Sequence, residues 1–371
     1  MHLTYRDKMN NAVVLYDFYK KLQRIISKPR KIEAFWPSEA SADYYERETE
    51  TIRTIGKCQR AIFYSQHNVI PTTANGYLSI KRMKLGDLVE ANEIHYGHLM
   101  STKILSQIPL QIKYDNIVIN GKIDEIVFDN LRSLYDLIEH KSGYGWNFEK
   151  DIIAGGTYKP EHAMQIGLYI YGGKFQNLLA PFGIEANQIG TSVILYTSRG
   201  NCENADDVIV DVEQVGITHQ IKVYARRKIK KGKDNPIEIK DTVDHLINIE
   251  NIFTKCKHIY NCSVKGVLPE NDFAAEWNKT YLNSMLKRKK ISDADKLNIS
   301  SEKKIPWQCS YCQYHEMCIK NEYPKTLEEY QKEATVRMED IKISYKDQYG
   351  IDLQDIDNVL PESKDAVSTT E

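Results

Sequence analysis

Hydrophobic residues recur at helical spacing in several separate parts of the chain. Residues 1–35 mix apolar and basic side chains and predict a first helix. A second helix start is predicted at 36–39, because Ser38 can cap the helical residues that follow. Further helices are predicted at 58–64, 85–105, 160–171, 241–260, 273–290 and 326–345.

Between these helices lie segments typical of strands. Residues 110–114 alternate apolar and polar side chains, and 117–119 leads into Asn120-Gly121, a dipeptide that predicts a hairpin turn. The predicted strands are 110–114, 117–119, 122–128, 133–141, 191–196, 208–212 and 220–229. This order of elements predicts an α/β (α+β) fold with a central mixed sheet flanked by helices.

The composition agrees with such a globular fold. The chain has 371 residues, of which 42% are hydrophobic and 27% charged, enough for one large or two modest domains. No apolar run approaches the ~18 residues of a membrane span, and the N-terminus lacks a signal-peptide core. We therefore expect a cytoplasmic protein that makes no membrane contact.

The charge distribution is uneven although the formal net charge is only -1. Residues 222–233 and 287–290 are strongly basic, and the C-terminal tail is acidic. A basic run can be a DNA contact or simply a solvated face, and the sequence leaves both readings open.

Four cysteines suggest a metal centre. Cys309, Cys312 and Cys318 are spaced C-x2-C-x5-C, and Cys58 stands far upstream. Three thiols this close cannot all form disulfides with one another, but they can share a soft metal or an iron–sulfur cluster with Cys58 as the fourth ligand. The other cysteines are interpreted as ordinary free thiols: Cys202, Cys256 and Cys262.

Acidic residues in the middle of the chain suggest a second centre. Glu139 and Lys141 point to the same face of a predicted strand, and Asp124 on the preceding strand can meet them there. Converging carboxylates bind Mg²⁺ or Mn²⁺, and a nearby lysine can orient a water or hold a phosphate oxygen. The alternative is a surface strand that carries a Glu–Lys pair.

The next predicted helix has Gln165 and Tyr169 on one face, four residues apart. Taken alone, this pair indicates a boundary residue and a core residue. Its position directly after Asp124, Glu139 and Lys141 makes it part of a longer pattern.

That pattern is the succession G-x-x-D, E-x-K and Q-x-x-x-Y at 121–124, 139–141 and 165–169. It resembles the RecB-like branch of the PD-(D/E)XK nucleases. Cys58-Gln-Arg60 and the 309–318 cysteines are similar to the segments that hold a [4Fe–4S] cluster in the AddB and CRISPR-associated exonuclease type. The resemblance covers residues 38–320.

The resemblance implies a PD-(D/E)XK restriction-endonuclease-like core with an iron–sulfur clasp. Asp124, Glu139, the carbonyl of His140 and an upstream acid would bind Mg²⁺ or Mn²⁺, while Lys141 would assist the attacking water. Gln165 and Tyr169 would contact the DNA backbone or support the site. The structural cluster would be held by Cys58, Cys309, Cys312 and Cys318.

Two assignments keep alternatives open. Gly86-Asp-Leu-Val-Glu90 fits the first acidic motif, so Glu90 is preferred as the upstream ligand over His95 and His98. For the cysteines, zinc is the rival to iron–sulfur. His67 and His315 could serve zinc, but their spacing is poor.

The predicted function is a Mg²⁺- or Mn²⁺-dependent deoxyribonuclease, most simply an exonuclease acting on single strands or duplex ends in recombination, repair or CRISPR-type processing, with protein partners in such a complex. The alternatives are a catalytically idle DNA-binding subunit and a restriction-type endonuclease. The expected domains are an N-terminal helical extension (1–35), the nuclease domain (36–320, with 199–300 as a DNA-contacting insertion) and a C-terminal helix with an acidic mobile tail (321–371).

Overall fold

The computed structural model describes residues 4–46, 51–72, 75–100, 103–230, 237–273, 287, 309, 312–353 and 355–356. The chain divides into two compact units. The first comprises Met1–Lys31, His67–Leu85 and Pro324–Glu371, and the second comprises Ile32–Gln66 and Gly86–Tyr323. All residues of both candidate sites belong to the second unit.

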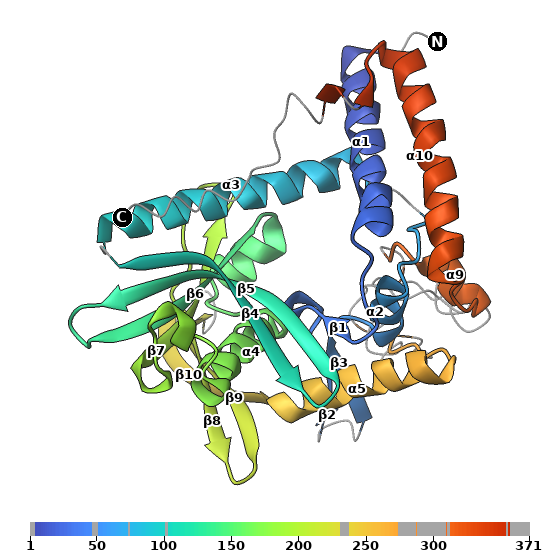
Figure 1. The fold of residues 1–371 in the computed structure, drawn as a ribbon. Coiled ribbons are helices and arrows are strands. Elements are labelled where there is room, and N and C mark those ends of the chain that lie inside the picture. Colours follow the sequence, from blue (N-terminus) through green and yellow to red (C-terminus); the bar gives the residue numbers. More distant parts are fainter. Residues whose placement is uncertain are drawn as a thin grey trace. The chain divides into compact units, whose positions relative to one another are not determined.

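The first unit contains a pair of long helices, α1 (Tyr5–Ser27) and α10 (Leu327–Tyr349), which lie side by side (Figure 1). Each begins with a capping box, in which Thr4 or Thr326 accepts a hydrogen bond from a backbone N–H of the first turn. Both predicted helices are confirmed, but α1 ends at Ser27, well before the predicted end at residue 35. The side chains that they bury include Tyr19, Leu22, Tyr330 and Ala334.

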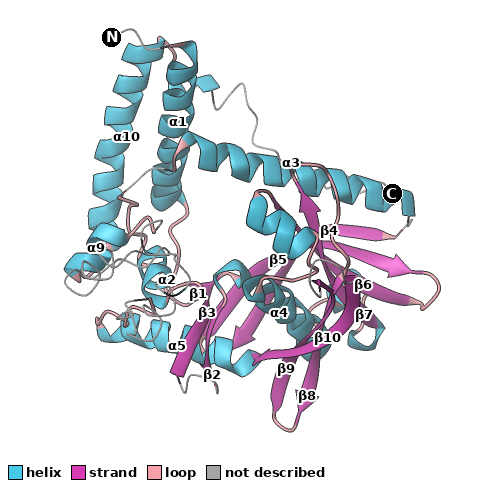
Figure 2. Cartoon of the chain, turned by 180° about the vertical axis from the view of Figure 1, so that it is seen from behind, coloured by secondary structure: helices cyan, strands magenta, loops and turns pink. Residues whose placement is uncertain are grey.

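The second unit is built on an eight-stranded mixed sheet with helices against it (Figure 2). Its strands are β1 (Ala34–Phe35), β4 (Ile104–Tyr114), β5 (Ile117–Asp129), β6 (Leu134–Gly143), β7 (Ile189–Ser198), β8 (Val208–Val215), β9 (Thr218–Lys230) and β10 (Ile237–Asn248). The order is β1-β5-β6-β7-β8-β9-β10, and β4 also pairs with β5. The pairs β1–β5 and β6–β7 are parallel and the others antiparallel. The predicted mixed sheet flanked by helices is thus confirmed.

The second unit also contains helices, short helical turns and two further strands, and it shares one helix with the first unit. They are η1 (Pro37–Glu39), β2 (Ser41–Glu46), β3 (Thr51–Gly56), α2 (Gln59–Gln66), α3 (Tyr77–Met100, which starts in the first unit), η2 (Phe148–Ile153), α4 (Pro160–Gln176), η3 (Ala180–Phe182), η4 (Ala186–Gln188), α5 (Ile249–Lys265) and α9 (His315–Lys320). Strands β2 and β3 form a separate two-stranded sheet.

Helix α4 is the buried centre of this unit. Its residues from Ala163 to Gly173 are buried, and it packs against β4, β7, β8 and β9. A Cβ atom on Gly167 would lie 2.8 Å from the side chain of Ile221 in β9, so the helix approaches the sheet closely. This packing holds the polar residues of α4 against the strands.

The predicted hairpin turn at Asn120-Gly121 is wrong. These residues lie inside β5, and the β4–β5 turn is at Asp115-Asn116, where Asp115 has a φ of 49°. Gly121 serves packing instead: a Cβ there would lie 2.6 Å from Pro37 and 2.7 Å from Tyr169.

Three predicted helices also differ from the structure. The start at 36–39 yields only the short η1, because β2 begins at Ser41. The helix predicted at 85–105 runs earlier, over Tyr77–Met100. Residues 241–248 extend β10 by pairing with β9, and helix α5 begins only at Ile249. Most of the predicted helix 273–290 lies outside the described residues.

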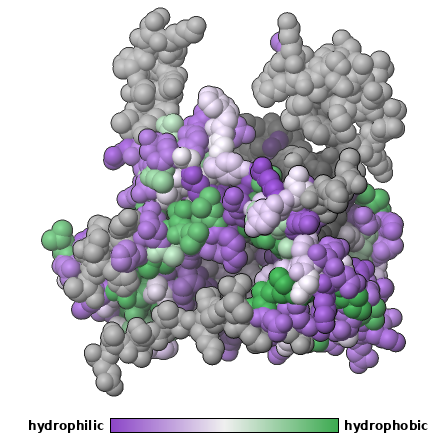
Figure 3. Space-filling view, turned by 90° about the horizontal axis from the view of Figure 1, so that it is seen from above, coloured by the Kyte–Doolittle hydropathy of each residue, from purple (hydrophilic) through white to green (hydrophobic). Residues whose placement is uncertain are grey.

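None of the helices described is both long and apolar enough to cross a membrane. The face seen in Figure 3 carries hydrophobic side chains in separate patches among hydrophilic ones.

In the basic run 222–233, Lys222 pairs with Glu213, and Arg226 pairs with Asp241 on the neighbouring strand. Residues 231–233 lie outside the described chain, as do 288–290 of the second basic run. The proposed DNA contact of these runs stays a prediction.

Candidate active site and cysteine centre

The first candidate site, called the carboxylate site, consists of Glu90, Asp124, Glu139, Lys141, Gln165 and Tyr169. The last register pair of β5 and β6 joins Glu125 to Ile138. Asp124 and Glu139 come next on these strands, so their side chains leave the sheet on the same side. The Asp124 carboxylate also accepts a hydrogen bond of 3.0 Å from the backbone N–H of His140 on β6.

Glu139 is the most buried carboxylate of the site, with a side chain only 1% exposed. Its Oε1 accepts hydrogen bonds from the Lys141 ammonium and, at 2.6 Å, from the Gln165 amide of α4. Gln165 also lies 3.3 Å from the Tyr169 hydroxyl. Glu139 Oε2 is buried and has no hydrogen-bond partner among the described residues, so one carboxylate oxygen is left for a cation or a bound water.

Glu90 reaches the site from α3. Its Oε1 accepts a hydrogen bond of 2.7 Å from Gln107, a residue of β4 with a φ of 55°. Burial raises the pKa of Glu90, and the charge of Asp124 raises it further. Glu90 therefore lies within electrostatic range of Asp124. Of its competitors, His95 is exposed, and the side chain of His98 lies outside the description.

The electrostatics show an excess of negative charge. Burial raises the pKa of Glu139 to about 8; Lys141 opposes this, while Asp124 and Glu90 add to it. Burial likewise raises the pKa of Asp124, against the pull of Lys141. Burial disfavours the Lys141 ammonium, but the surrounding carboxylates prevail and its pKa is raised. Lys141 is therefore a cation at neutral pH.

On the other side of the strands, His140 makes a contact that sequence reasoning missed. Its Nε2 lies 2.8 Å from Glu125 Oε2, and both side chains are buried. The side chain is thus held by Glu125 while the backbone N–H is held by Asp124. The two contacts fix the backbone whose carbonyl is the predicted metal ligand.

Within the described residues, no group of three or more His, Cys, Asp or Glu side chains is gathered closely enough to hold a metal ion. In the carboxylate site, the Lys141 ammonium occupies one oxygen of Glu139. The donors nevertheless fit Mg²⁺ or Mn²⁺, since they are hard oxygen ligands and one of them is a buried oxygen without a partner.

The second candidate site, called the cysteine site, consists of Cys58, Cys309, Cys312 and Cys318, all of them free thiols. Cys58 directly precedes α2, and its carbonyl accepts the N–H of Ile62. Cys312 donates its N–H to the carbonyl of Cys309, and Cys318 lies on α9.

Electrostatic coupling shows that the four thiols are neighbours. Burial raises the pKa of the Cys309 thiol, and the nearby sulfurs of Cys58, Cys318 and Cys312 raise it further. Burial also raises the pKa of Cys58 and Cys312. Burial thus favours the protonated thiols of Cys58, Cys309 and Cys312 over their thiolates.

Asn271 links the two halves of the cysteine site. Its Oδ1 lies 3.7 Å from the sulfur of Cys58, and its Nδ2 donates to the sulfur of Cys318 at 3.4 Å. Arg60 also reaches Cys318, with Nη1 3.7 Å from the sulfur and 3.3 Å from the carbonyl oxygen. The sulfur of Cys318 therefore has two hydrogen-bond donors.

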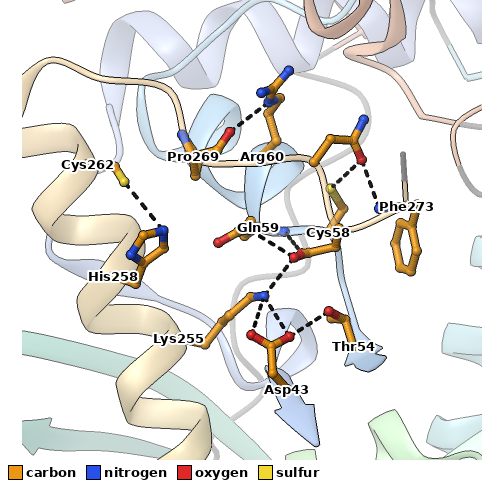
Figure 4. Close-up of polar contacts among 12 residues, drawn as sticks. Asp43, Thr54, Cys58, Gln59, Arg60, Lys255, His258, Cys262, Pro269 and Phe273 are labelled. Carbon is orange, nitrogen blue, oxygen red and sulfur yellow. Dashed lines mark hydrogen bonds and ion pairs between the residues drawn. The ribbon is translucent and has the colours of Figure 1, made fainter. Parts of the chain in front are cut away.

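The next residue, Asp272, anchors the start of α2, whose first residue Gln59 follows Cys58 (Figure 4). Its carboxylate accepts the backbone N–H and the side-chain amide of Gln59, at 2.7 and 2.9 Å. It also pairs at 2.7 Å with Lys255 of α5, which contacts Asp43 as well. Lys255 and Asp272 are 6% and 5% exposed, so a buried ion pair fixes the helix that follows Cys58.

The donors of the cysteine site fit an iron–sulfur cluster. Four cysteine thiols are the ligand set that such clusters use. N–H donors on the sulfur of Cys318 are also usual around cluster ligands. Of the zinc alternatives, His315 has a buried Nε2 with no partner among the described residues, and His67 lies in the other unit.

No protein-family model matches this chain, and no curated protein is significantly similar to it. The resemblance to RecB-like nucleases therefore rests on the motifs alone.

Sequence reasoning missed Gln107, Glu125, Asn271 and Asp272 as partners of the predicted site residues. None of them stands in a recognisable motif. Asn271-Asp272 follows Leu268-Pro269 in a loop, and only the fold brings this loop to Cys58, more than two hundred positions earlier.

Proposed function

We propose that this protein is a Mg²⁺- or Mn²⁺-dependent deoxyribonuclease with a PD-(D/E)XK core and a structural iron–sulfur cluster. The observation that carries the proposal is the pair Asp124 and Glu139 on neighbouring strands, with Lys141 on one oxygen of Glu139 and the other oxygen buried without a partner among the described residues. Helix α3, strands β4, β5 and β6, helix α4 and strand β7 would form the nuclease core.

Glu90, Asp124, Glu139 and the carbonyl of His140 would hold the cation. When bound, the cation lowers the pKa of its water and stabilises negative charge on the scissile phosphate. Crowded buried carboxylates are suited to this role, since their mutual repulsion is relieved by a divalent ion.

Lys141 has a separate role. The surrounding carboxylates raise its pKa, which favours the charged ammonium over the neutral amine that a general base requires. It would instead donate hydrogen bonds to a phosphate oxygen or to the attacking water. Gln165 and Tyr169 would keep Glu139 in place from α4.

The geometry argues against the catalytically idle subunit. A binding protein gains nothing from buried acids beside a lysine, because the acids repel the DNA backbone. An active centre needs this arrangement to hold its metal.

The test is incubation of the anaerobically purified protein with end-labelled DNA, single- and double-stranded, linear and circular, in Mg²⁺ or Mn²⁺. We expect cleavage that stops when EDTA is added. If circular DNA is not cut, the enzyme is an exonuclease. If circular DNA is cut, the result favours the endonuclease alternative. Failure to cut any of these substrates would refute the proposal.

A further inference from the structure

A cavity of about 810 Å³ opens at the ends of β6 and β7. Its lining combines aromatic, acidic and amide side chains: Tyr144, Trp146, Glu149, Asn201, Glu203 and Asn204. None of these residues belongs to the carboxylate site or to the cysteine site.

The cavity lies next to the carboxylate site along the chain. Strand β6 carries Glu139 and Lys141 and ends at Gly143, which is in register with Ser198 at the end of β7. The N–H of Arg199 then donates to the carbonyl of Gly143 at 2.7 Å. Strands β6 and β7 are parallel, and the carboxyl ends of parallel strands are where α/β sheets commonly bind their ligands.

Two aromatic rings are presented at this strand end. Trp146 is 77% exposed and Tyr144 is 45% exposed. The Arg199 guanidinium lies 5.5 Å from the centroid of the Tyr144 ring, in a cation–π contact. Exposed flat rings beside a guanidinium are the usual stacking surface for an unpaired base.

Arg199 also lies close to the helix that carries Glu90. A Cβ atom built on Gly86 would lie 3.6 Å from Ser142 Oγ and 4.0 Å from Arg199 Nη1. Gly86 is four residues before Glu90, about one helical turn. Arg199 thus connects the aromatic cavity to the side of α3 that leads to the carboxylate site.

The polar part of the lining selects against phosphate. Glu149 Oε1 accepts a hydrogen bond of 2.6 Å from Ser198, and Glu203 adds a second acid to the cavity. Carboxylates repel a phosphate but accept hydrogen bonds from the amino groups of bases. Asn201 and Asn204 can both donate and accept, as base edges require.

We propose that this cavity binds an unpaired base of single-stranded DNA whose backbone runs past the carboxylate site. Trp146 and Tyr144 stack on the base, the acidic and amide side chains contact its edge, and Arg199 contacts the adjoining phosphate. This inference rests on the proposed nuclease function and extends it, since it selects single strands over duplexes.

The test measures DNA affinity by fluorescence anisotropy in an Asp124→Ala background with Mn²⁺, so that no strand is cut. The probes are a labelled single strand of mixed sequence, its duplex, and the same strand made abasic over its length. Trp146→Ala should weaken binding of the normal single strand about tenfold, as the loss of one stacked base predicts. The duplex and the abasic strand should bind this variant and its parent equally.

Two further variants separate stacking from damage to the fold. Trp146→Phe should retain most of the affinity, because it keeps a flat ring. Phe182→Ala removes a 39% exposed ring outside the cavity and should change nothing. Two outcomes would refute the base-binding cavity but not the nuclease proposal. In the first, Trp146→Ala binds the normal single strand as tightly as its parent. In the second, the variant loses as much affinity for the abasic strand as for the normal one. A parent protein that neither binds nor cuts any DNA would overturn the nuclease proposal as well.

Discussion

The carboxylate site and the cysteine site are built in opposite ways. The first takes its residues from one stretch, Glu90 to Tyr169, and holds them on long helices and strands. The second joins Cys58, the loop at Asn271 and the segment around Cys318, which are far apart in the chain. The first is rigid through the sheet itself, whereas the second depends on contacts between separate segments.

The charges of the two sites differ as well. Burial raises the pKa values of the acids in the carboxylate site, and Lys141 is the cation that opposes this rise for Asp124 and Glu139. The cysteine site holds thiols whose pKa values burial raises, fixed by the amide of Asn271 and by the Asp272–Lys255 pair. We infer that a cation in the first site serves chemistry, whereas a cluster in the second serves the fold.

The largest expected effect is on the cysteine site. Cys58→Ser should strip iron from anaerobically purified protein, bleach its visible absorbance and lower its solubility, because one of four cluster ligands is lost. Iron content and the visible spectrum are the measurements. Cys202→Ser, which removes an exposed thiol, should keep the colour. Stoichiometric zinc without iron in the parent protein would refute the cluster.

Lys255→Met should give the next largest effect. It leaves Asp272 buried without its cation, which typically costs about 3–5 kcal/mol. The free energy of unfolding in urea is the measurement. Lys257→Met on the same helix breaks the exposed pair with Asp115, so its stability should stay close to that of the parent protein. Equal effects would show that the buried pair does not hold the start of α2.

Gly121→Ala should disturb the carboxylate site through packing. The new methyl group would press on Pro37 and Tyr169, which typically costs about 1–3 kcal/mol, and it would displace the helix that holds Glu139. The free energy of unfolding and the nuclease rate should both be lower than those of the parent protein. Gly76→Ala meets no atom within 4 Å and is the control. A Gly121→Ala variant as stable as the control would contradict this packing role.

The smallest effect concerns the link between pH and cation binding. The pKa of Glu139 is raised from 4.5 to about 8, so between these values the folded protein keeps a proton that the unfolded chain has lost. The metal-free protein therefore loses stability as the pH rises through this window. Mn²⁺ should raise the melting temperature, and should do so more at about pH 8 than at about pH 6, since it competes with that proton. In Glu139→Gln, Mn²⁺ should raise the melting temperature equally at both pH values. If the variant keeps the parental dependence on pH, the ion binds elsewhere.

Strand alternation predicted that Asp124, Glu139 and Lys141 would meet, because the period of two is a local property of the backbone. Gly121 was misread as a turn residue, since the sequence does not reveal that Pro37 and Tyr169 leave no room for a side chain. The local sequence pattern also predicted a helix over 241–248, but these residues pair with β9 and form a strand.

The partners of the cysteine site were beyond sequence reasoning for a different reason. Cysteine spacing indicated a shared ligand, but the bridge through Asn271 depends on the path of a loop. The exposed Trp146 likewise gains meaning only from the cavity that surrounds it.

The central claim is that the carboxylate site cleaves DNA with a bound cation. The most direct measurement compares the Mn²⁺-dependent cleavage rates of Asp124→Ala and Asp129→Ala on end-labelled DNA. Both changes remove a carboxylate from β5, but Asp129 lies at the surface and pairs with Arg132. We expect Asp124→Ala to abolish cleavage while keeping the iron content and fold of the parent, and Asp129→Ala to cut at the parental rate. Full cleavage by Asp124→Ala would contradict the account.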